Sequence, residues 1–425
     1  MPGTKSDFRQ AGQKFASRCS APCSRRSRRC VCTPSLPAAR SALSPLTSPP
    51  TFESWQAAIR SSARVSSLQP LELAESPQLD ALGESGKHID AAPNGTLFRF
   101  AVISDTHFWL PSRARGDWSS RSDAQPERDG LLVSDSDAIL QQLLSQLSHF
   151  AASGGSFALH AGDAVCGGGS FHQPPTEYER ALRAFREQQT VAFGNWPVFH
   201  VPGNHDIDPT EGGLAKWRRI LGTSGLGNTS DLEVGYRALR VAPGWRLLLL
   251  DSMDGVPHDL DGHGHIGEAQ LAWLAAQLDE SAAASEQVIL AMHQLLVSPV
   301  DEGVQETELP GWLDWHGDFV DNRAEVLALL ARHSHVRLSF HGHVHANTLT
   351  TRHGTVFVTN AAGGEYPMHW REVSVHPCEI RIRTRAIEAP ALLEKSRLRD
   401  TRPNRNHIKR GEQLANGASV RLPWC

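Results

Sequence analysis

Short apolar runs, each bounded by turn residues, recur along the chain between residues 97 and 388. Each run has the length of a β-strand, and together they predict strands at Phe98–Ser104, Ser156–His160, Pro197–Val201, Leu247–Leu250, Val288–Met292, Val336–Phe340, Val356–Thr359 and Glu379–Ile387. Apolar residues at helical spacing predict helices over Asp135–Ala152, Thr176–Gln189 and Gly267–Leu278. Helices alternate with strands early in the chain, and strands crowd together later. We therefore expect an α/β sandwich with layered sheets rather than one doubly wound sheet.

The segment before this pattern is rich in serine, proline and arginine, and the segment after it is polar and basic. Residues 1–95 are predicted to be a leader and linker that is largely disordered, with a short helix possible over Thr51–Leu68. The folded domain is expected over residues 96–388. Residues 389–425 are expected to be a polar tail without a regular element.

Charge is distributed unevenly along the 425 residues. The first 50 residues carry nine lysines or arginines against one aspartate, so this segment is +8 and the rest of the chain is −12. An acidic body argues against a protein that grips nucleic acid over a wide surface. An Arg- and Ser-rich, acid-poor leader is typical of a transit peptide for a plastid or mitochondrion, although a disordered tail or an upstream start codon explains it equally and leaves the protein cytoplasmic. No apolar run approaches the ~20 residues that span a bilayer, so we expect a soluble, intracellular protein.

Polar side chains follow five of the predicted strands at the point where each strand ends. The motifs are Asp-Thr-His at 105–107, Gly-Asp at 162–163, Gly-Asn-His-Asp at 203–206, a single histidine at 293, and Gly-His-Val-His at 342–345. Ligands of α/β sheets bind in the crevice at the carboxyl ends of the strands. Core packing does not account for carboxylate, imidazole and amide groups at successive strand ends, because each would be costly to bury unpaired. The pattern therefore indicates a common binding site.

The order of the five motifs resembles that of the calcineurin-like metallophosphoesterase superfamily, which is D-x-H, G-D, G-N-H-D/E, a single H and G-H-x-H. The resemblance covers roughly Phe98 to Ile387 and includes every motif, with a long gap between His107 and Asp163. It implies a layered α-β-β-α sandwich, in which two packed mixed β-sheets are flanked by helices. It also implies that residues 96–388 are a catalytic domain that hydrolyses phosphate esters.

The resemblance further implies a ligand set for two metal ions. Asp105, His107 and His345 would hold the first ion, Asn204, His293 and His343 the second, and Asp163 would bridge them. Two divalent ions ~3.5–4 Å apart repel each other unless anions lie between them. With two carboxylates and neutral donors, the pair of ions keeps a charge of about +2, or about +1 with a bridging hydroxide, which attracts phosphate and prepares the hydroxide to attack phosphorus.

Oxygen and nitrogen donors without a thiolate suit Mn, Fe, Zn or Co, and the sequence does not choose among these metals. His205 is left over once the ligands are assigned. By the resemblance, His205 paired with Asp206 assists the leaving group or stabilises the transition state, so both are candidate catalytic residues.

Departures from two branches of the superfamily narrow the expected activity. Cys166 stands where purple acid phosphatases carry a metal-bound tyrosine, and a small buried hydrophobe is the commoner role for such a cysteine. Cys166-Gly-Gly and Asp206 replace the Asp-Arg and Glu of Ser/Thr protein phosphatases. The chain looks closer to class III cyclic-nucleotide phosphodiesterases and nucleotide pyrophosphatases, which share the stretches at 250–252 (Leu-Asp-Ser) and 270–274 (Gln-Leu-Ala-Trp-Leu).

The expected substrate is a small phosphodiester or nucleotide pyrophosphate. Two long segments could shape its pocket, Phe108–Asp135 with Trp109 and Trp118, and Pro299–Asn322 with Trp312, Trp315 and His316. The cluster of His258, His263 and His265 is either a polar loop or a metal site.

Three other activities remain open. A phosphomonoesterase acting on a small metabolite needs additional positive groups, for which the candidates are His172, Arg180 and Arg371. A nuclease lacks an obvious basic channel, and a non-catalytic metal-binding scaffold is opposed by the intact ligand set.

Overall fold

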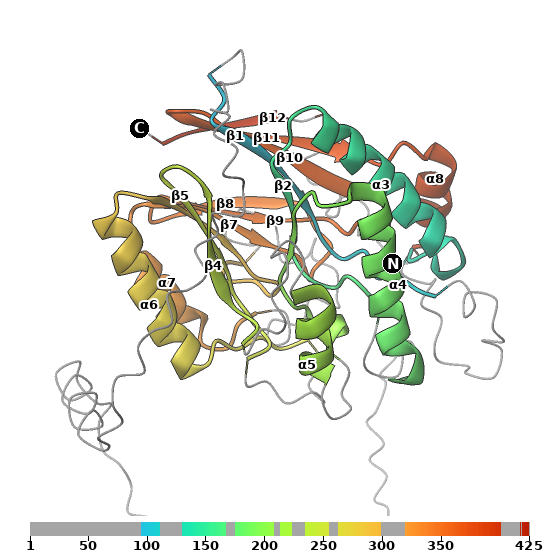
Figure 1. The fold of residues 1–425 in the computed structure, drawn as a ribbon, viewed down its shortest axis with the longest axis horizontal. Coiled ribbons are helices and arrows are strands. Elements are labelled where there is room, and N and C mark those ends of the chain that lie inside the picture. Colours follow the sequence, from blue (N-terminus) through green and yellow to red (C-terminus); the bar gives the residue numbers. More distant parts are fainter. Residues whose placement is uncertain are drawn as a thin grey trace, which may run out of the picture. The chain divides into compact units, whose positions relative to one another are not determined.

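The computed structural model describes residues 95–110, 130–166, 175–207, 213–222, 234–254, 262–298, 319–400, 417 and 419–424. These residues form two six-stranded β-sheets that pack face to face, with helices on the outer face of each sheet (Figure 1). This is the layered α-β-β-α arrangement that the resemblance implies, and the predicted fold class is confirmed.

The first sheet has the strand order β12-β11-β10-β1-β2-β3. Its strands are β1 (Phe98–Ile103), β2 (Phe157–His160), β3 (Val198–His200), β10 (His369–Val375), β11 (Glu379–Ala386) and β12 (Ser419–Pro423). Strands β1, β2 and β3 are parallel. Strand β10 pairs with β1, β11 with β10 and β12 with β11, each in the antiparallel sense. The carboxyl ends of the three parallel strands therefore lie at one edge of this sheet.

The second sheet has the order β4-β5-β6-β7-β9-β8. Its strands are β4 (Arg237–Ala242), β5 (Trp245–Leu249), β6 (Gln287–Ala291), β7 (Val336–His341), β8 (Thr348–Arg352) and β9 (Thr355–Thr359). Strands β5, β6, β7 and β9 are parallel, and antiparallel β4 and β8 form the two edges.

Several central strands are mainly apolar because both faces of each sheet are covered. Along β1, Phe100 and Val102 point into the layer between the sheets, while Ala101 and Ile103 belong to the cluster beneath the helices. Strand β5 alternates in the same way, with Leu247 in the central layer and neighbouring Leu248 on the helical side. Continuous burial therefore explains why these strands read as short apolar runs rather than as alternating patterns.

The helices divide between the two sheets. Helices α3 (Ser136–Ala152) and α8 (Pro390–Arg399) pack on the outer face of the first sheet, and α6 (Glu268–Ala283) and α7 (Arg323–Leu330) pack on that of the second (Figure 1). Helices α4 (Pro175–Phe193) and α5 (Gly213–Trp217) share a hydrophobic cluster with the segments that follow β1 and β2. Short turns complete the described elements at η3 (Val133–Asp135), η4 (Asn204–Asp206) and η5 (Arg218–Gly222).

Each of the eight predicted strands and three predicted helices coincides with an observed element to within a few residues. The prediction that residues after Glu388 contain no regular element is wrong, because α8 and β12 lie there. Strand β12 is short and alternately exposed at the edge of its sheet, and α8 contributes only Leu392 and Leu393 to the neighbouring core, so both have weak apolar patterns. The leader up to residue 94 and the helix expected over Thr51–Leu68 lie outside the described residues.

None of the helices in the described ranges is long and apolar enough to cross a bilayer. Cys378, which precedes β11, is disulfide-bonded, and Cys166 is buried and is not in a disulfide.

Candidate metal centre

The five motifs converge where parallel strands of the two sheets end. The first sheet contributes the segments that follow β1, β2 and β3, which carry Asp105, Asp163 and Asn204. The second sheet contributes the segments that follow β6 and β7, which carry His293 and His343. Among the described residues, two candidate metal-binding groups join the sheets, and they consist of Asp105, His107 and His345 in one case and Asp163, His293 and His343 in the other.

The backbone at the centre adopts a conformation that L-residues rarely take. Five residues have positive φ angles between 43° and 73°, and they are Asp105, His107, Asp163, His343 and His345. Each such residue costs roughly 1–3 kcal/mol and persists only where its surroundings fix it. Here the N–H of Asp105 donates to the carbonyl of Gly162 at 3.0 Å, and the N–H of His107 donates to that of Asp163 at 3.1 Å. The backbone is therefore held in the shape that turns these side chains inward.

In the first group, the ring nitrogens of two histidines face each other near a carboxylate. The Nε2 atoms of His107 and His345 are 2.9 Å apart, and Oδ1 of Asp105 lies 3.9 Å from the first and 3.4 Å from the second. Burial lowers the pKa of His107 to about 3, so its ring is neutral and keeps a lone pair for a metal. Asp105 also accepts hydrogen bonds from the N–H of His343 and from the hydroxyl of Ser104, which orient the carboxylate.

The second group is built around Asp163. Its Oδ1 accepts the backbone N–H of His205 at 2.8 Å, and its Oδ2 lies 3.1 Å from Nε2 of His293. The Nδ1 atom of His293 donates to the carbonyl of Ala161 at 2.8 Å, which leaves Nε2 directed at the carboxylate. Burial opposes protonation of His293, but the charges of Asp163 and Asp105 outweigh it and raise the pKa of this histidine to about 9.

The centre concentrates negative charge away from water. Asp105 is inaccessible to solvent and Asp163 is 1% exposed, and within the described part of the chain their ion-pair partners are all histidines. Burial raises the pKa of both acids, but nearby histidines, His345 for the first and His293 for the second, hold both pKa values below the ordinary range. Two ionised buried carboxylates without a lysine or arginine call for cations between them.

The third motif completes the fit. The Oδ1 atom of Asn204 is buried and has no hydrogen-bond partner among the residues that the structure describes, as expected for a donor reserved for a metal. Gly203 is required here, because a Cβ at this position would overlap Oδ1 of Asp163. The donor set and this orphaned oxygen both fit a dinuclear metal site.

The two candidate catalytic residues differ in their surroundings. The His205 side chain is 24% exposed, and its Nε2 is 3.9 Å from Oδ2 of Asp163, so it lies at the open side of the centre. Asp206 is fully buried, and its carboxylate accepts the backbone N–H groups of Val165 and Gly203, each at 3.1 Å. Burial, followed by the charge of Asp163, raises the pKa of Asp206 to about 8. These contacts fix the segments that carry Asp163 and Asn204, while the pairing of Asp206 with His205 stays a prediction.

Sequence reasoning missed Glu365. This residue is 1% exposed, and its Oε1 accepts a hydrogen bond of 2.6 Å from Nδ1 of His345. A carboxylate on the far nitrogen of a ligand histidine orients the ring and makes it a better donor. Glu365 follows two glycines in the segment after β9, and only the position of that segment at the end of a parallel strand could have indicated it.

Most of the remaining candidates either contact other residues or lie outside the described ranges. Trp109 is inaccessible and packs with Val133 and Cys166, so it does not offer a stacking surface to a substrate. Arg371 is buried and donates to Thr384 and Asn347, and the exposed Arg180 is paired with Glu177. His263 contacts Asp321 at 3.1 Å. Trp118, His172, His258, Trp312, Trp315 and His316 lie outside the described residues.

The stretches that resemble cyclic-nucleotide phosphodiesterases are structural in this chain. The side chain of Gln270 accepts the backbone N–H of Asp251 and donates to its carbonyl, both at 2.8 Å, which joins α6 to the end of β5. Leu274 and Leu278 on α6 are fully buried.

The family model and the curated proteins that this chain matches are all phosphoesterases or phosphodiesterases. Residues 98–347 match the model of the calcineurin-like phosphoesterase family. The chain is 28% identical over 210 residues to the 3',5'-cyclic adenosine monophosphate phosphodiesterase CpdA of Escherichia coli K12, a match that covers 48% of this chain and 65% of that protein. It is 31% identical over 209 residues to a probable cyclic nucleotide phosphodiesterase of Synechococcus, which covers 48% of this chain and 67% of that protein. The chain thus spans about two thirds of the length of the curated relatives that it matches.

Among solved structures, a dimetal phosphatase from Danio rerio has a similar fold. The TM-score is 0.51 at 15% sequence identity, and the match covers 78% of this chain and 100% of that chain. At this identity the likeness supports the fold alone.

Proposed function

Because the chain belongs to the calcineurin-like phosphoesterase family, we propose that it hydrolyses phosphate esters with two divalent metal ions bound at this centre. The observation that carries the proposal is the pair of donor groups around two buried carboxylates, Asp105 and Asp163. His293 lies within 3.9 Å of Asp105 and 3.1 Å of Asp163, so the two groups adjoin.

We assign the ligands as the motifs imply. Asp105, His107 and His345 hold one ion, Asn204, His293 and His343 hold the other, and Asp163 bridges them. The position of Asp163 supports the bridging role, since Oδ2 lies 3.8 Å from Nε2 of His107 in one group and 3.1 Å from Nε2 of His293 in the other. Mn, Fe, Zn and Co all suit this mixture of imidazole, carboxylate and amide donors.

Two such ions supply charge to the phosphate and acidify a water molecule for attack on phosphorus. The protein's own contribution is to hold the donors and to place His205 beside the reacting phosphate. The His205 side chain is 24% exposed, whereas the neighbouring Asp163 carboxylate is 1% exposed, so His205 is accessible from the rim. A histidine there can donate a proton or a hydrogen bond to the departing oxygen.

We propose a small phosphodiester or a nucleotide pyrophosphate as the substrate. The curated relatives named as cyclic-nucleotide phosphodiesterases support this class. A phosphate monoester would need extra cations, and two of the three candidates, Arg180 and Arg371, contact other residues, whereas His172 lies outside the described ranges. The protein loaded with Mn²⁺ should therefore hydrolyse a phosphodiester faster than a phosphomonoester.

The test measures how fast the full chain, loaded with Mn²⁺, hydrolyses bis-p-nitrophenyl phosphate, p-nitrophenyl phosphate and 3',5'-cyclic AMP. We expect hydrolysis of the diesters, and we expect Asp163→Asn to abolish it. Asp321→Asn is a matched control, since Asp321 is 55% exposed and lies outside both donor groups. Activity on the monoester alone would overturn the diesterase assignment, and no activity with any of the four metals would favour a binding scaffold.

A further inference from the structure

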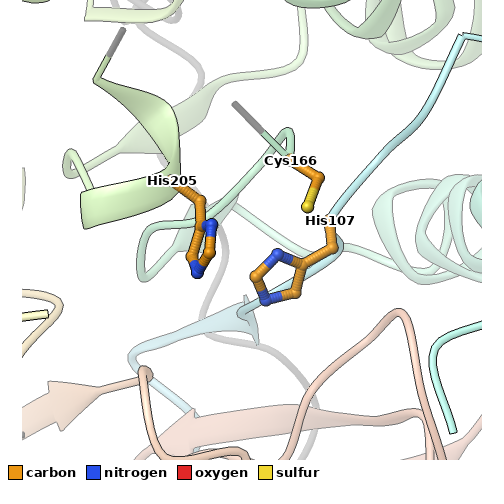
Figure 2. A group of neighbouring side chains, drawn as sticks. All are labelled: His107, Cys166 and His205. Atoms are coloured by element: carbon orange, nitrogen blue, oxygen red, sulfur yellow. The ribbon is translucent and has the colours of Figure 1, made fainter. Parts of the chain in front are cut away.

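A third donor group lies beside the centre and shares one residue with it. His107, Cys166 and His205 place one donor atom each within 4.8 Å of one another. Figure 2 shows the thiol of Cys166 directed toward the ring of His107, with the ring of His205 facing the same space. The ligand assignment proposed above gives no role to Cys166.

The backbone holds these side chains in register. The segment after β1 runs parallel to the segment after β2, with a bridge between Phe108 and Val165. The N–H of Phe108 donates to Ala164 at 3.0 Å, and the N–H of Cys166 donates back to Phe108 at 3.2 Å. His205 is tied to the same place by the bond from its N–H to Asp163. The cluster is therefore built by strand pairing and does not depend on loose surface side chains.

A second observation indicates that the group has room for a ligand. The Nε2 atom of His107 faces Asp105, Asp163 and His345, whereas its Nδ1 atom is buried and has no hydrogen-bond partner in the described ranges. His107 itself is 3% exposed. A buried, unsatisfied ring nitrogen beside a thiol is costly unless something binds it.

We propose that His107, Cys166 and His205 form an inhibitory site for a thiophilic divalent cation such as Zn²⁺ or Cd²⁺. Two imidazole nitrogens and one sulfur are donors that such cations prefer, with a fourth position open to water. Tetrahedral Zn²⁺ requires donor atoms roughly 3.3–3.7 Å apart, so the side chains close on the ion by about 1 Å. Binding releases the thiol proton of Cys166 to solvent and forms the metal–sulfur bond.

The consequence for activity follows from the shared residues, and it rests on the proposed function. A neutral imidazole has a lone pair on only one ring nitrogen, so an ion bound to Nδ1 of His107 leaves the ring proton on Nε2, which can then no longer bind an ion together with Asp105 and His345. The same ion holds His205 away from the substrate. Mn²⁺, which binds thiolate poorly, supports activity, while a thiophilic ion suppresses it. The cation binding itself does not depend on whether the protein hydrolyses anything.

The test uses the full chain, loaded with Mn²⁺ and titrated with Cd²⁺ while thiolate-to-cadmium charge-transfer absorption is recorded in the ultraviolet. We expect one further Cd²⁺ per chain in the wild type, and we expect both Cys166→Ser and His205→Asn to lose the same part of the absorption. Cys166→Ala removes the sulfur in a second way. His353→Asn is the matched control, because His353 is exposed on the turn between β8 and β9 and should leave the absorption intact. Cysteines elsewhere contribute equally to every variant.

Equal absorption in the wild type and both Cys166 variants would overturn the site. Absorption that depends on Cys166 but persists in His205→Asn would overturn it too, since the sulfur would then bind without the histidine. In the activity assay, the Cd²⁺ concentration that halves each variant's own rate should rise at least about tenfold in Cys166→Ser, because one of three ligands is lost. A wild type that binds Cd²⁺ spectroscopically but shows no hydrolysis would refute the proposed function and leave the cation site standing.

Discussion

Replacing Glu365 by glutamine tests whether this buried carboxylate tunes the metal centre through His345. The hydrogen bond from Nδ1 of His345 to Oε1 of Glu365 is 2.6 Å long and sits in a site that excludes water. Glutamine keeps an oxygen that can accept this hydrogen bond, so the substitution removes the charge and largely preserves the shape. Charge-assisted hydrogen bonds are about twice as strong as neutral ones, so the ring should become a poorer metal donor.

The expected loss is about 10- to 100-fold in metal affinity, or ~1.4–2.7 kcal/mol. The size of this loss of metal affinity should also depend on pH, because His345 binds a proton when no metal is present. Burial lowers the pKa of His345, but Glu365 and Asp105 outweigh it and raise the pKa to about 9 without metal, so below that pH a metal must displace a proton. Glutamine lowers this pKa, so a proton competes less with the metal for His345 in the variant than in the wild type. The difference in metal affinity between the two proteins should therefore become smaller as pH falls.

Titration calorimetry with Mn²⁺ on full-length Glu365→Gln and wild type, at about pH 8.5 and about pH 7, measures both effects. Glu372→Gln is the matched control, because Glu372 on β10 pairs with Arg99 and Arg385 and does not touch the centre. Unchanged Mn²⁺ affinity at both pH values would show that Glu365 does not act through His345. A deficit that widens at low pH would refute the proton-competition argument.

Four further substitutions address other parts of the structure. Asp163→Asn should lose bound Mn²⁺ measured by elemental analysis, and full metal content would rule out the bridge. His205→Ala should lower turnover by ~10²–10⁴-fold and keep its metals, so stoichiometric metal loss would contradict its catalytic role. Gly203→Ala should lower Mn²⁺ content because its Cβ displaces Asp163, and wild-type content would show that the segment relaxes. Burial raises the pKa of Asp251 from 3.8 to about 7, so the folded chain keeps a proton that the unfolded chain releases, and stability falls as pH rises through this window. Urea unfolding should therefore show that the free energy of unfolding of Asp251→Asn, relative to wild type, is up to ~3 kcal/mol more favourable at pH 8 than at pH 5. A difference between the two proteins that does not change with pH would exclude the buried proton.

The predictable part of the fold is the part that is buried on both faces. Strands such as β1 and β6 are mainly apolar, and α3 has an apolar stripe that ends at a glycine pair, so local pattern alone reveals them. Strand β10 escaped prediction because it carries His369 and Arg371, whose burial depends on partners such as Asn347 far away in the chain. Edge strands β4 and β8 have half-exposed, mixed patterns that resemble loops.

The same reasoning explains what was predicted of the centre. Motif order at strand ends anticipated the meeting of Asp105, His107 and His345, because parallel strands bring their carboxyl ends together. The place of Cys166, where purple acid phosphatases carry a metal-bound tyrosine, already indicated a position near the metals. The motifs could not anticipate that Glu365 supports His345. That contact arises from the register of backbone segments that the sequence separates, and no short motif encodes such a register.

The metal centre also lies on the seam between the two sheets. Asp105, Asp163 and Asn204 extend from the first sheet, and His293, His343 and His345 extend from the second, so each proposed ion is held by both layers. A ligand present at 100 times its dissociation constant adds ~2.7 kcal/mol to the stability of the state that binds it. Metal supply in the cell would then govern how long the protein survives proteases and heat as well as how fast it turns over.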